Sequence, residues 1–486
     1  MLFNSFAFLL FFPLVTVLYF LLPHRWRWAW LLGASCLFYM YFIPKYILIL
    51  IFTIVVDYFA GLLIEQAAGP RRKLLLLLSL AANVGVLAGF KYFNFLSANL
   101  QALARCLDWH YSLPTLEWLL PVGLSFHTFQ AMSYTIEVYR GRQKAERHFG
   151  IYALYVMFYP QLVAGPIERP QNLLHQFREV HSFDYQRISS GLKLMAWGLF
   201  TKTVVADNLA VLVNKVYAAP AQFQGPLLLA ATVLFAFQIF CDFSGYSDIA
   251  IGAARVMGFQ LMRNFNGPYT AQSIAEFWQR WHVSLSTWFK DYLYITLGGN
   301  RVAFPRWCVN IFLVFLVSGL WHGANWTYVI WGALHGLFLI VGAATLSWRQ
   351  HLATLSGLVR LPRLHAGLKV LTTFSLVCLG WIFFRASSVH DAWLICCQLG
   401  TGWGTCLQPA LMAGQWRELG MGPLLRVALL GGVVAALVQA AKWRPALSVW
   451  LRGQPWWLRW SLYYALVGSI FFLHAENADQ FIYFQF

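Results

Sequence analysis

The sequence predicts an all-α polytopic membrane protein. Hydrophobic residues make up 59% of the 486 residues, and charged residues make up only 11%. A soluble protein of this size could not hide so much apolar surface. Apolar runs long enough to cross a bilayer as helices recur along the whole chain. The first run, residues 6–22, has no basic segment before it and no small-residue cleavage site after it, so we expect it to be retained as a span.

The predicted spans follow one another closely. Residues 151–167 are apolar but short and interrupted by proline, so we expect them only to dip into the bilayer. No tandem repeat, low-complexity tract or flexible linker divides the chain, and residues 1–486 are expected to form one membrane domain. The runs that we expect to cross the membrane are 5–22, 28–43, 44–65, 74–96, 116–138, 189–215, 226–256, 307–346 in two passes, 368–385, 423–441 and 457–474.

Lysine and arginine are concentrated in alternate loops. Nine of these residues follow the first, third and fifth predicted spans, whereas the loops between offer only Lys45 and Arg105. The positive-inside rule then places the basic loops in the cytoplasm, and both termini, with the 386–422 loop, on the outer side. The same rule accounts for the net charge of +17 without a nucleic-acid partner, because no RNA-binding signature accompanies the charge.

The eight cysteines show no pattern of a metal site. There is no C-x-x-C pair and no histidine at the spacing that zinc sites use. Cys396, Cys397 and Cys406 share one predicted outer loop, where a disulfide between two of them stays open as an alternative.

Residues 258–306 form the longest predicted cytoplasmic stretch. Seven aromatic residues fall between Phe277 and Tyr294, mixed with charged residues. This composition is typical of helices that lie at the membrane interface, where aromatic rings prefer to sit. Glu276 and Arg280 are four residues apart and support a helix locally, and Gly298 with Gly299 is expected to end the segment.

The run from Ile311 to Ile340 contains His322 but no aspartate, glutamate, lysine or arginine. Thirty helical residues would reach about 45 Å, against a hydrocarbon core of about 30 Å. A break is therefore expected within Gly319–Asn325. Irregular backbone at membrane depth is tolerated where it lines a cavity, so His322 is expected to face a cavity or tunnel. The alternative is a neutral histidine packed in the core, and spacing alone leaves the two balanced.

Other titratable residues in apolar context are harder to assign. We expect His335 and His127 to be packing residues, whereas His282 could serve packing or a site equally well. Asp242 and Asp248, with Ser244 between them, form an ion site or a hydrogen-bonded helix break. The signatures of serine hydrolases, zinc proteases and nucleotide-binding loops are missing, which leaves a histidine as the candidate general base.

Several long motifs can be compared with known families. They are FYPQLVAGPIERP (158–170), FSGYSDIAIGAARVMGF (243–259), NFNGPYTAQSIAEFWQRWHVSLSTWFKDYLYITLGGNR (264–301), SGLWHGANWTYVIWGALHG (318–336) and FIYFQF (481–486), and they extend from residue 158 to the last residue. Together these motifs resemble the membrane-bound O-acyltransferase (MBOAT) family, in its branch that O-acetylates alginate and other exopolysaccharides.

The resemblance implies a fold and a reaction. It implies a ring of about 11 transmembrane helices, with re-entrant and interfacial helices, around a tunnel through the bacterial inner membrane. The family's histidine matches His322, and its second polar position matches His282. The implied donor is cytoplasmic acetyl-CoA, used as co-substrate with no bound cofactor or metal. The implied partners are a periplasmic SGNH-type acetyltransferase and a secreted polysaccharide, besides membrane lipid.

Further residues have expected roles in such a site. A neutral histidine can take the proton of a hydroxyl that attacks the thioester, and the oxyanion then needs donors. The tunnel and oxyanion candidates are Trp321, Asn325, Trp326, Asp242 and Ser244. Arg280 and Arg301 are the candidates to bind CoA phosphates, although positive-inside bias also explains them.

Two other functions stay open. One is a D-alanyltransferase of the teichoic-acid branch, fed by a carrier protein. The other is a transporter or flippase of polysaccharide precursors, suggested by Asp242, Asp248 and the broken segments. Transporters are often built from paired halves, and we detect no such internal symmetry.

Overall fold

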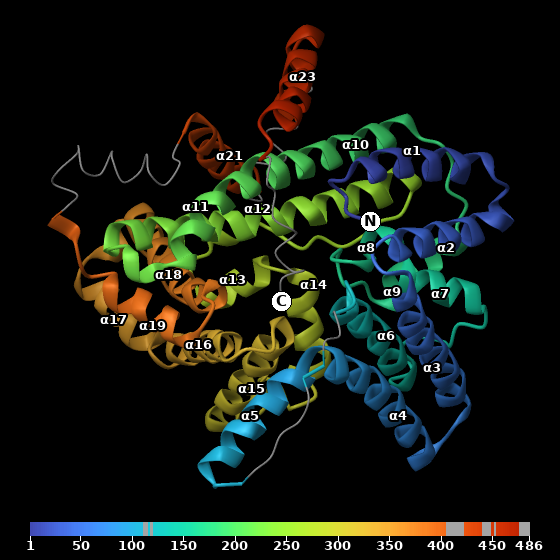
Figure 1. The fold of residues 1–486 in the computed structure, drawn as a ribbon, viewed down its shortest axis with the longest axis horizontal. Coiled ribbons are helices and arrows are strands. Elements are labelled where there is room, and N and C mark those ends of the chain that lie inside the picture. Colours follow the sequence, from blue (N-terminus) through green and yellow to red (C-terminus); the bar gives the residue numbers. More distant parts are fainter. Residues whose placement is uncertain (110–114, 117–119, 405–421, 440–448, 452, 476–486) are drawn as a thin grey trace. The chain divides into compact units, whose positions relative to one another are not determined.

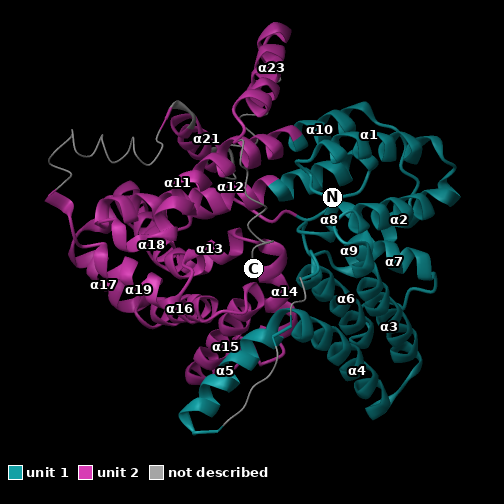
Figure 2. Ribbon diagram, viewed as in Figure 1, with its two compact units in different colours: residues 1–195, 246–262 teal, residues 196–245, 263–486 magenta. Residues whose placement is uncertain are grey.

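The computed structural model describes residues 1–109, 115–116, 120–404, 422–439, 449–451 and 453–475. These residues form helices and connecting turns, and no strand is assigned among them. They divide into two compact units, residues 1–195 with 246–262 and residues 196–245 with 263–486 (Figure 2). The predicted all-α class is confirmed. The FIYFQF tail, Cys406 and residues 117–119 of one predicted span lie outside the described residues.

Unit 1 is built from the N-terminal helices (Figure 1). The chain passes into unit 2 within α10, and α12 contributes to both units. The helices of unit 1 are α1 (Phe6–Leu21), α2 (His24–Met40), α3 (Ile47–Gln66), α4 (Gly69–Leu87), α5 (Phe93–Cys106), α6 (Leu124–Tyr139), α7 (Phe149–Met157), α8 (Tyr159–Leu162), α9 (Pro170–Leu173) and most of α10 (Tyr185–Phe200), with the short turns η1 (Pro44–Tyr46), η2 (Ala88–Tyr92) and η3 (His175–Arg178).

Unit 2 holds the remaining helices and the histidine motifs. Its helices are α11 (Asp207–Ala218), the first part of α12 (Gly225–Met257), α13 (Ile274–Arg280), α14 (Val283–Phe289), α15 (Phe304–His322), α16 (Trp326–Ala344), α17 (Leu346–Leu355), α18 (Pro362–Arg385), α19 (Val389–Gln398), α21 (Pro423–Gln439) and α23 (Trp456–Phe472), with the short turns η4 (Thr201–Ala206), η5 (Pro220–Gln222), η6 (Pro268–Thr270), η7 (Lys290–Tyr294) and η8 (Leu358–Arg360).

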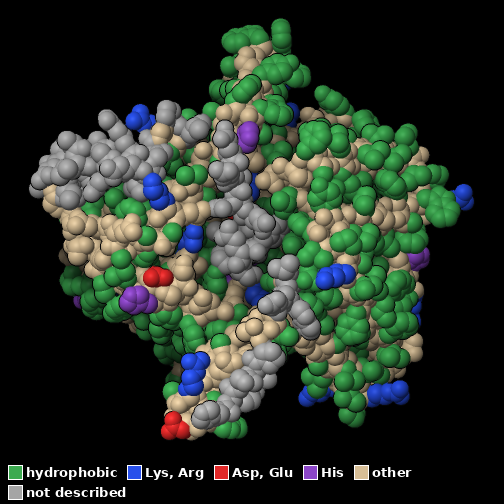
Figure 3. All heavy atoms as spheres, viewed as in Figure 1, with side chains coloured by type: hydrophobic (Ala, Val, Ile, Leu, Met, Phe, Trp, Pro, Cys, Tyr) green, Lys and Arg blue, Asp and Glu red, His purple; other side chains and the backbone are tan. Residues whose placement is uncertain are grey.

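The described helices have the length and composition of a multi-pass membrane protein. Seven of them are long and apolar enough to cross a bilayer, and shorter apolar helices are found at Phe6–Leu21 and Leu425–Ala436. Hydrophobic side chains cover much of the visible surface, and charged ones are sparse on it (Figure 3). Each predicted span has a helix in the described residues, and 151–167 forms only the short helices α7 and α8. The orientation, the ring and the tunnel stay predictions.

Two local expectations need correction. Asp242 and Asp248 do not mark a helix break, because both lie within the continuous helix α12. Six residues correspond to about 600° of helical rotation, so the two carboxylates leave the helix on different faces. Cys396 and Cys397 lie on helix α19 rather than in a loop, and both thiols are free.

Glu168 holds the loop after α8 in unit 1. Its carboxylate is fully buried, and it accepts hydrogen bonds from the backbone N–H of Met262, at 2.5 Å, and from the side chain of Asn172. Burial raises the pKa of Glu168 to about 7, although these hydrogen bonds oppose the shift. The protonated carboxyl therefore suits the folded state better than the carboxylate does.

The contribution of Glu168 to stability is expected to fall as the pH rises from about 4.5 to about 7, the ordinary and the folded-state pKa of its carboxyl group. At this residue the folded state binds more protons than the unfolded state in this window, so each rise in pH reduces the contribution, by up to roughly 3 kcal/mol in all. Thermal unfolding of the wild type and of Glu168→Gln in detergent at a series of pH values measures it as the difference between the two proteins. The wild type should lose stability relative to Glu168→Gln across the window, and a difference that does not change with pH would contradict the assignment.

Candidate active site

His322 is the last residue of α15, and the chain turns directly after it. Gly323 is extended, with φ −164° and ψ 151°. Asn325 then caps α16, its side-chain oxygen accepting a hydrogen bond from the N–H of Thr327 at 3.0 Å. The predicted break is confirmed, and the 311–340 run forms a helical hairpin with His322 at its tip.

Glycines let the two helices of this hairpin approach closely. A Cβ atom on Gly319 would lie 2.3 Å from the carbonyl oxygen of Tyr328, and one on Gly332 would lie 2.3 Å from that of Phe315. A Cβ atom on Gly323 would lie 2.1 Å from the Tyr328 ring. A side chain at Gly319 or Gly332 would push the helices apart, as at other close helix contacts in membranes, and one at Gly323 would displace the Tyr328 ring. This glycine seam, Gly319, Gly323 and Gly332, therefore fixes where the end of α15 lies.

Aromatic rings surround His322, which is only 4% exposed. The ring centroids of Trp331, Trp321 and Phe384 lie 4.9, 5.0 and 5.4 Å from that of the imidazole. All three contacts are edge-to-face, with interplanar angles of 85°, 82° and 74°. Edge-to-face packing restricts how a ring can turn, so the imidazole of His322 is held in one orientation.

His335 lies deeper in the same aromatic cluster. It is fully buried, and its Nδ1 accepts a hydrogen bond from the indole N–H of Trp278 at 3.3 Å. Its Nε2 lies against Gly380, where a Cβ atom would approach it to 2.8 Å. The ring of Trp331 lies 5.0 Å from that of His335 and also contacts His322. These contacts agree with the packing role predicted for His335.

His282 is held in an unusual backbone conformation between α13 and α14. Its φ of 43° is in the left-handed region, which residues other than glycine seldom adopt. Hydrogen bonds to Asn264 hold the residues that follow His282. The backbone carbonyl of Asn264 accepts a hydrogen bond from the Val283 N–H at 2.9 Å, and its side-chain oxygen accepts one from the Ser284 hydroxyl at 2.6 Å. The His282 Nδ1 lies 3.3 Å from the same Asn264 side-chain oxygen. Burial lowers the pKa of His282 to about 3, so the imidazole is neutral at physiological pH.

The indole of Trp321 connects the two candidate histidines. Its ring centroid lies 5.0 Å from that of His322 and 6.2 Å from that of His282. Phe243 of α12 packs edge-to-face on His282 at 4.6 Å. The fold therefore brings the tip of the α15–α16 hairpin and the start of α14 to one place, although the two histidines are 40 residues apart in sequence.

Comparison with known proteins places these motifs in a family. A model of the membrane-bound O-acyltransferase family matches residues 147–389, which contain His282, His322 and His335. The probable alginate O-acetylase of Pseudomonas aeruginosa is 41% identical over 81% of this chain and 74% of its own length.

This chain belongs to the membrane-bound O-acyltransferase family.

Other members differ in what their names say they modify. The peptidoglycan O-acetyltransferase of Helicobacter pylori is 37% identical over 75% of this chain and 72% of its own length. The teichoic acid D-alanyltransferase of Streptococcus thermophilus is 29% identical over 56% of this chain and 69% of its own length. As a member of this family, the chain is an O-acyltransferase.

The other predicted residues of this MBOAT site differ in burial and in hydrogen bonding. Ser244 is buried on α12, and Trp326 is 51% exposed at the start of α16. The amide of Asn325 serves as the cap of α16 and approaches the Ser387 carbonyl at 3.5 Å. Their roles as tunnel or oxyanion groups stay predictions, as does that of Trp321.

Asp242 belongs to a buried ion cluster that the sequence did not reveal. Lys202 Nζ lies 2.5 Å from Asp207 Oδ1 and 2.8 Å from Asp242 Oδ1, and all three side chains are at most 5% exposed. Lys202 lies in η4, a short π-helical segment that joins α10 to α11. A lysine inside an apolar run was the available signal, because a buried cation in a membrane helix needs a partner. Among the described residues, no group of three or more His, Cys, Asp or Glu could hold a metal ion.

The two arginines predicted to bind CoA phosphates differ in their surroundings. Arg280 forms an ion pair with Glu276 and donates to the Thr270 hydroxyl at 2.8 Å, so its guanidinium already braces the turn η6. The Glu276–Arg280 pair expected from sequence is confirmed. Arg301 is exposed just before α15. Their phosphate-binding roles stay predictions.

Proposed function

We propose that this protein transfers an acetyl group from cytoplasmic acetyl-CoA for the O-acetylation of a secreted polysaccharide, alginate-like or cellulose-like. The names of its relatives, an alginate O-acetylase and a peptidoglycan O-acetyltransferase, support the acetyl group and the polysaccharide. The observation that carries the proposal is the enclosure of His322 at the tip of the α15–α16 hairpin, within a match to an O-acyltransferase family.

His322 is proposed to act as the general base. Its imidazole takes the proton from the attacking hydroxyl while the oxygen forms a bond to the thioester carbonyl carbon. The tetrahedral intermediate then expels the CoA thiolate, which leaves readily and collects a proton. The edge-to-face rings of Trp321, Trp331 and Phe384 hold the imidazole in place, so little of its freedom has to be lost as the reaction begins.

His282 is proposed to be the second polar group of the site. Its neutral imidazole lies beside the ring of Trp321, which also contacts His322. The left-handed backbone of His282 fixes the direction in which its side chain leaves the turn. A neutral imidazole can both donate and accept a hydrogen bond, which suits the positioning of a hydroxyl or of the thioester. Backbone strain of this kind is often found at functional sites.

The acetyl group is proposed to reach the polymer outside the cytoplasm through an SGNH-type periplasmic acetyltransferase. The concentration of lysine and arginine in alternate loops supports a cytoplasmic donor side, with the termini outside, in a bacterial inner membrane. A relay through a partner accounts for how a cytoplasmic thioester can modify a polymer that is secreted.

A second candidate is the transfer of D-alanine from a carrier protein, supported by the match to a teichoic acid D-alanyltransferase. The lower identity and the shorter overlap of that match favour the acetyl donor.

A labelled-donor assay distinguishes the candidates. Purified protein is expected to release CoA from [¹⁴C]acetyl-CoA in the presence of acceptor, and to leave D-alanyl carrier protein intact. The acceptors to compare are the exopolysaccharide with and without an SGNH-type partner. Turnover of the D-alanyl carrier alone would replace the proposal by the second candidate. Movement of label into vesicles without thioester cleavage would instead indicate a transporter.

A further inference from the structure

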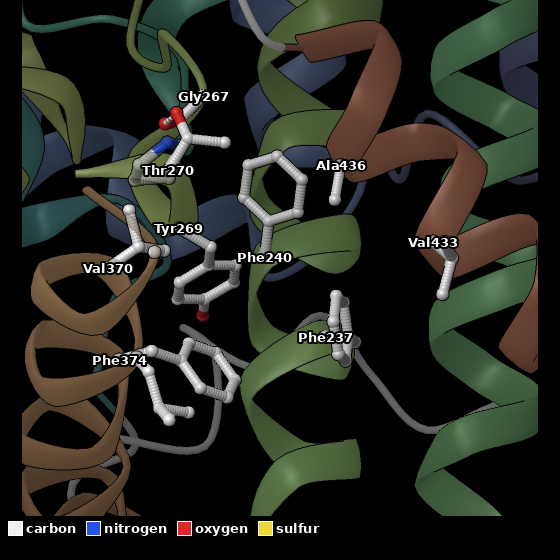
Figure 4. A pocket seen from close by; sticks show the side chains of 12 residues that line it. Phe237, Phe240, Gly267, Tyr269, Thr270, Val370, Phe374, Val433 and Ala436 are labelled. Carbon is white, nitrogen blue, oxygen red and sulfur yellow. Dashed lines mark hydrogen bonds between the residues drawn. The ribbon is translucent and has the colours of Figure 1, made fainter. Parts of the chain in front are cut away.

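Unit 2 contains an apolar cavity of about 370 Å³ that is lined by none of the three histidines described above. It lies between helices α12, α18 and α21, and residues of the turn η6 also line it (Figure 4). The side chains that form its walls include Phe237, Phe240, Tyr269, Phe374, Val433 and Ala436.

The few polar atoms of the lining are already used within the protein. The Tyr269 hydroxyl donates to the carbonyl of Ala236 at 2.6 Å, and the Thr270 hydroxyl donates to that of Gly267 at 2.8 Å. An apolar cavity with no polar group to offer does not hold ordered water. Its natural occupant is a flexible hydrocarbon that restores the packing contacts an empty space would forfeit.

The mouth of the cavity lies on helix faces that suit contact with lipid. Leu371 on α18 and Val433 on α21 both line the cavity and are 61% and 47% exposed. Helix α18 is long and apolar enough to span a bilayer, and α21 contains the shorter apolar helix Leu425–Ala436. Hydrocarbon chains of the membrane are therefore the most abundant material able to enter.

Two exposed cations on α18 lie close in sequence to residues that line the cavity. Gly267, Thr270 and Val370 lie at one end of the cavity and Phe374 lies further along α18 (Figure 4). Lys369 precedes Val370, and Arg363 lies one turn before Gly367, which also lines the cavity; both cations are exposed. Clusters of lysine and arginine beside cytoplasmic helix ends attract anionic lipid headgroups.

We propose that this cavity binds one acyl chain of an anionic membrane phospholipid, with its phosphate toward Lys369 and Arg363 and its chain toward Phe374 and Phe237. The site does not depend on the acetyl-transfer proposal. A lipid bound in the cavity would contact α12, α18 and α21 at once and so hold these helices together. Helix α18 also carries Phe384, whose ring contacts His322.

Gly367→Leu provides the test, because a Cβ atom at Gly367 meets nothing within 4 Å and a longer side chain can occupy the cavity without displacing backbone. Gly342→Leu on α16 is the matched control, since that position also has open space but does not line the cavity. Each protein is purified in mild detergent and its retained phospholipid is extracted and identified by mass spectrometry. Gly367→Leu should retain roughly tenfold less, the change that 1.4 kcal/mol of lost packing produces, while Gly342→Leu should match the wild type.

Two further measurements keep the test decisive. Lys369→Gln should lower the anionic fraction of the retained lipid. A phospholipid with a photoreactive acyl chain should label wild-type peptides of α12, α18 or α21, which does not require the variant to fold. Equal retention by Gly367→Leu and the wild type would overturn the proposal. So would a retained pool of only zwitterionic lipid, acyl-CoA or detergent.

Discussion

Replacing His322 with alanine is expected to lower the rate of acetyl transfer by about 10²–10⁴-fold while the protein still inserts and folds. The change removes the proposed general base but leaves the glycine seam and the Asn325 cap, which fix the hairpin, in place. The measurement is CoA release from acetyl-CoA with saturating acceptor, together with the thermal unfolding midpoint in detergent.

His351→Ala is a suitable control for this experiment, because His351 is exposed on α17 and outside the aromatic cluster. It should keep wild-type activity. Transfer by folded His322→Ala at the wild-type rate would show that another group takes the proton, and the mechanism proposed above would have to be abandoned.

Replacing Lys202 with methionine is expected to destabilise the fold by about 3–5 kcal/mol, the usual cost of leaving a buried charge without its partner. Lys202 lies between the carboxylates of Asp207 and Asp242, and water cannot reach these side chains to solvate the charges left behind. The yield of monodisperse protein and its unfolding midpoint measure the effect. Lys193→Met, at an exposed position of α10, should change stability by less than about 0.5 kcal/mol.

Replacing the two carboxylates by amides shows whether the stability lost in Lys202→Met comes from unpaired charge or from altered packing. A triple variant that combines Lys202→Met with Asp207→Asn and Asp242→Asn should recover much of the lost stability, because no unpaired charge remains. If the triple variant is no more stable than Lys202→Met alone, the ion cluster is not the cause of the loss.

The sequence allowed the local architecture around His322 to be predicted because that architecture follows from length. A run of apolar residues too long for one span had to break, and Gly323 with Asn325 marked the place. The packing role of His335 could be anticipated in the same way from the glycines beside it. These are properties of neighbouring residues, which periodicity and propensity report well.

Contacts between distant segments could not be predicted in this way. Nothing local to Asp242 shows that Lys202, 40 residues earlier, would neutralise it. Of the two alternatives that the sequence leaves open for Asp242 and Asp248, the helix break is wrong because α12 is continuous. The meeting of His282 and His322 at Trp321 depends likewise on how α12, α14 and α15 pack. The left-handed backbone of His282 had no sequence signal, since the residues after it donate their hydrogen bonds to Asn264, which lies before α13.

The glycine seam ties the surroundings of His322 to the packing of two helices. The rings that contact His322 stand on α15, α16 and α18, and the separation of α15 and α16 is set by backbone contacts at Gly319 and Gly332. A side chain at either glycine would move α15 away from α16, and with it Trp321 away from Trp331. The orientation of the His322 imidazole and the stability of the hairpin therefore cannot be varied independently at these two positions.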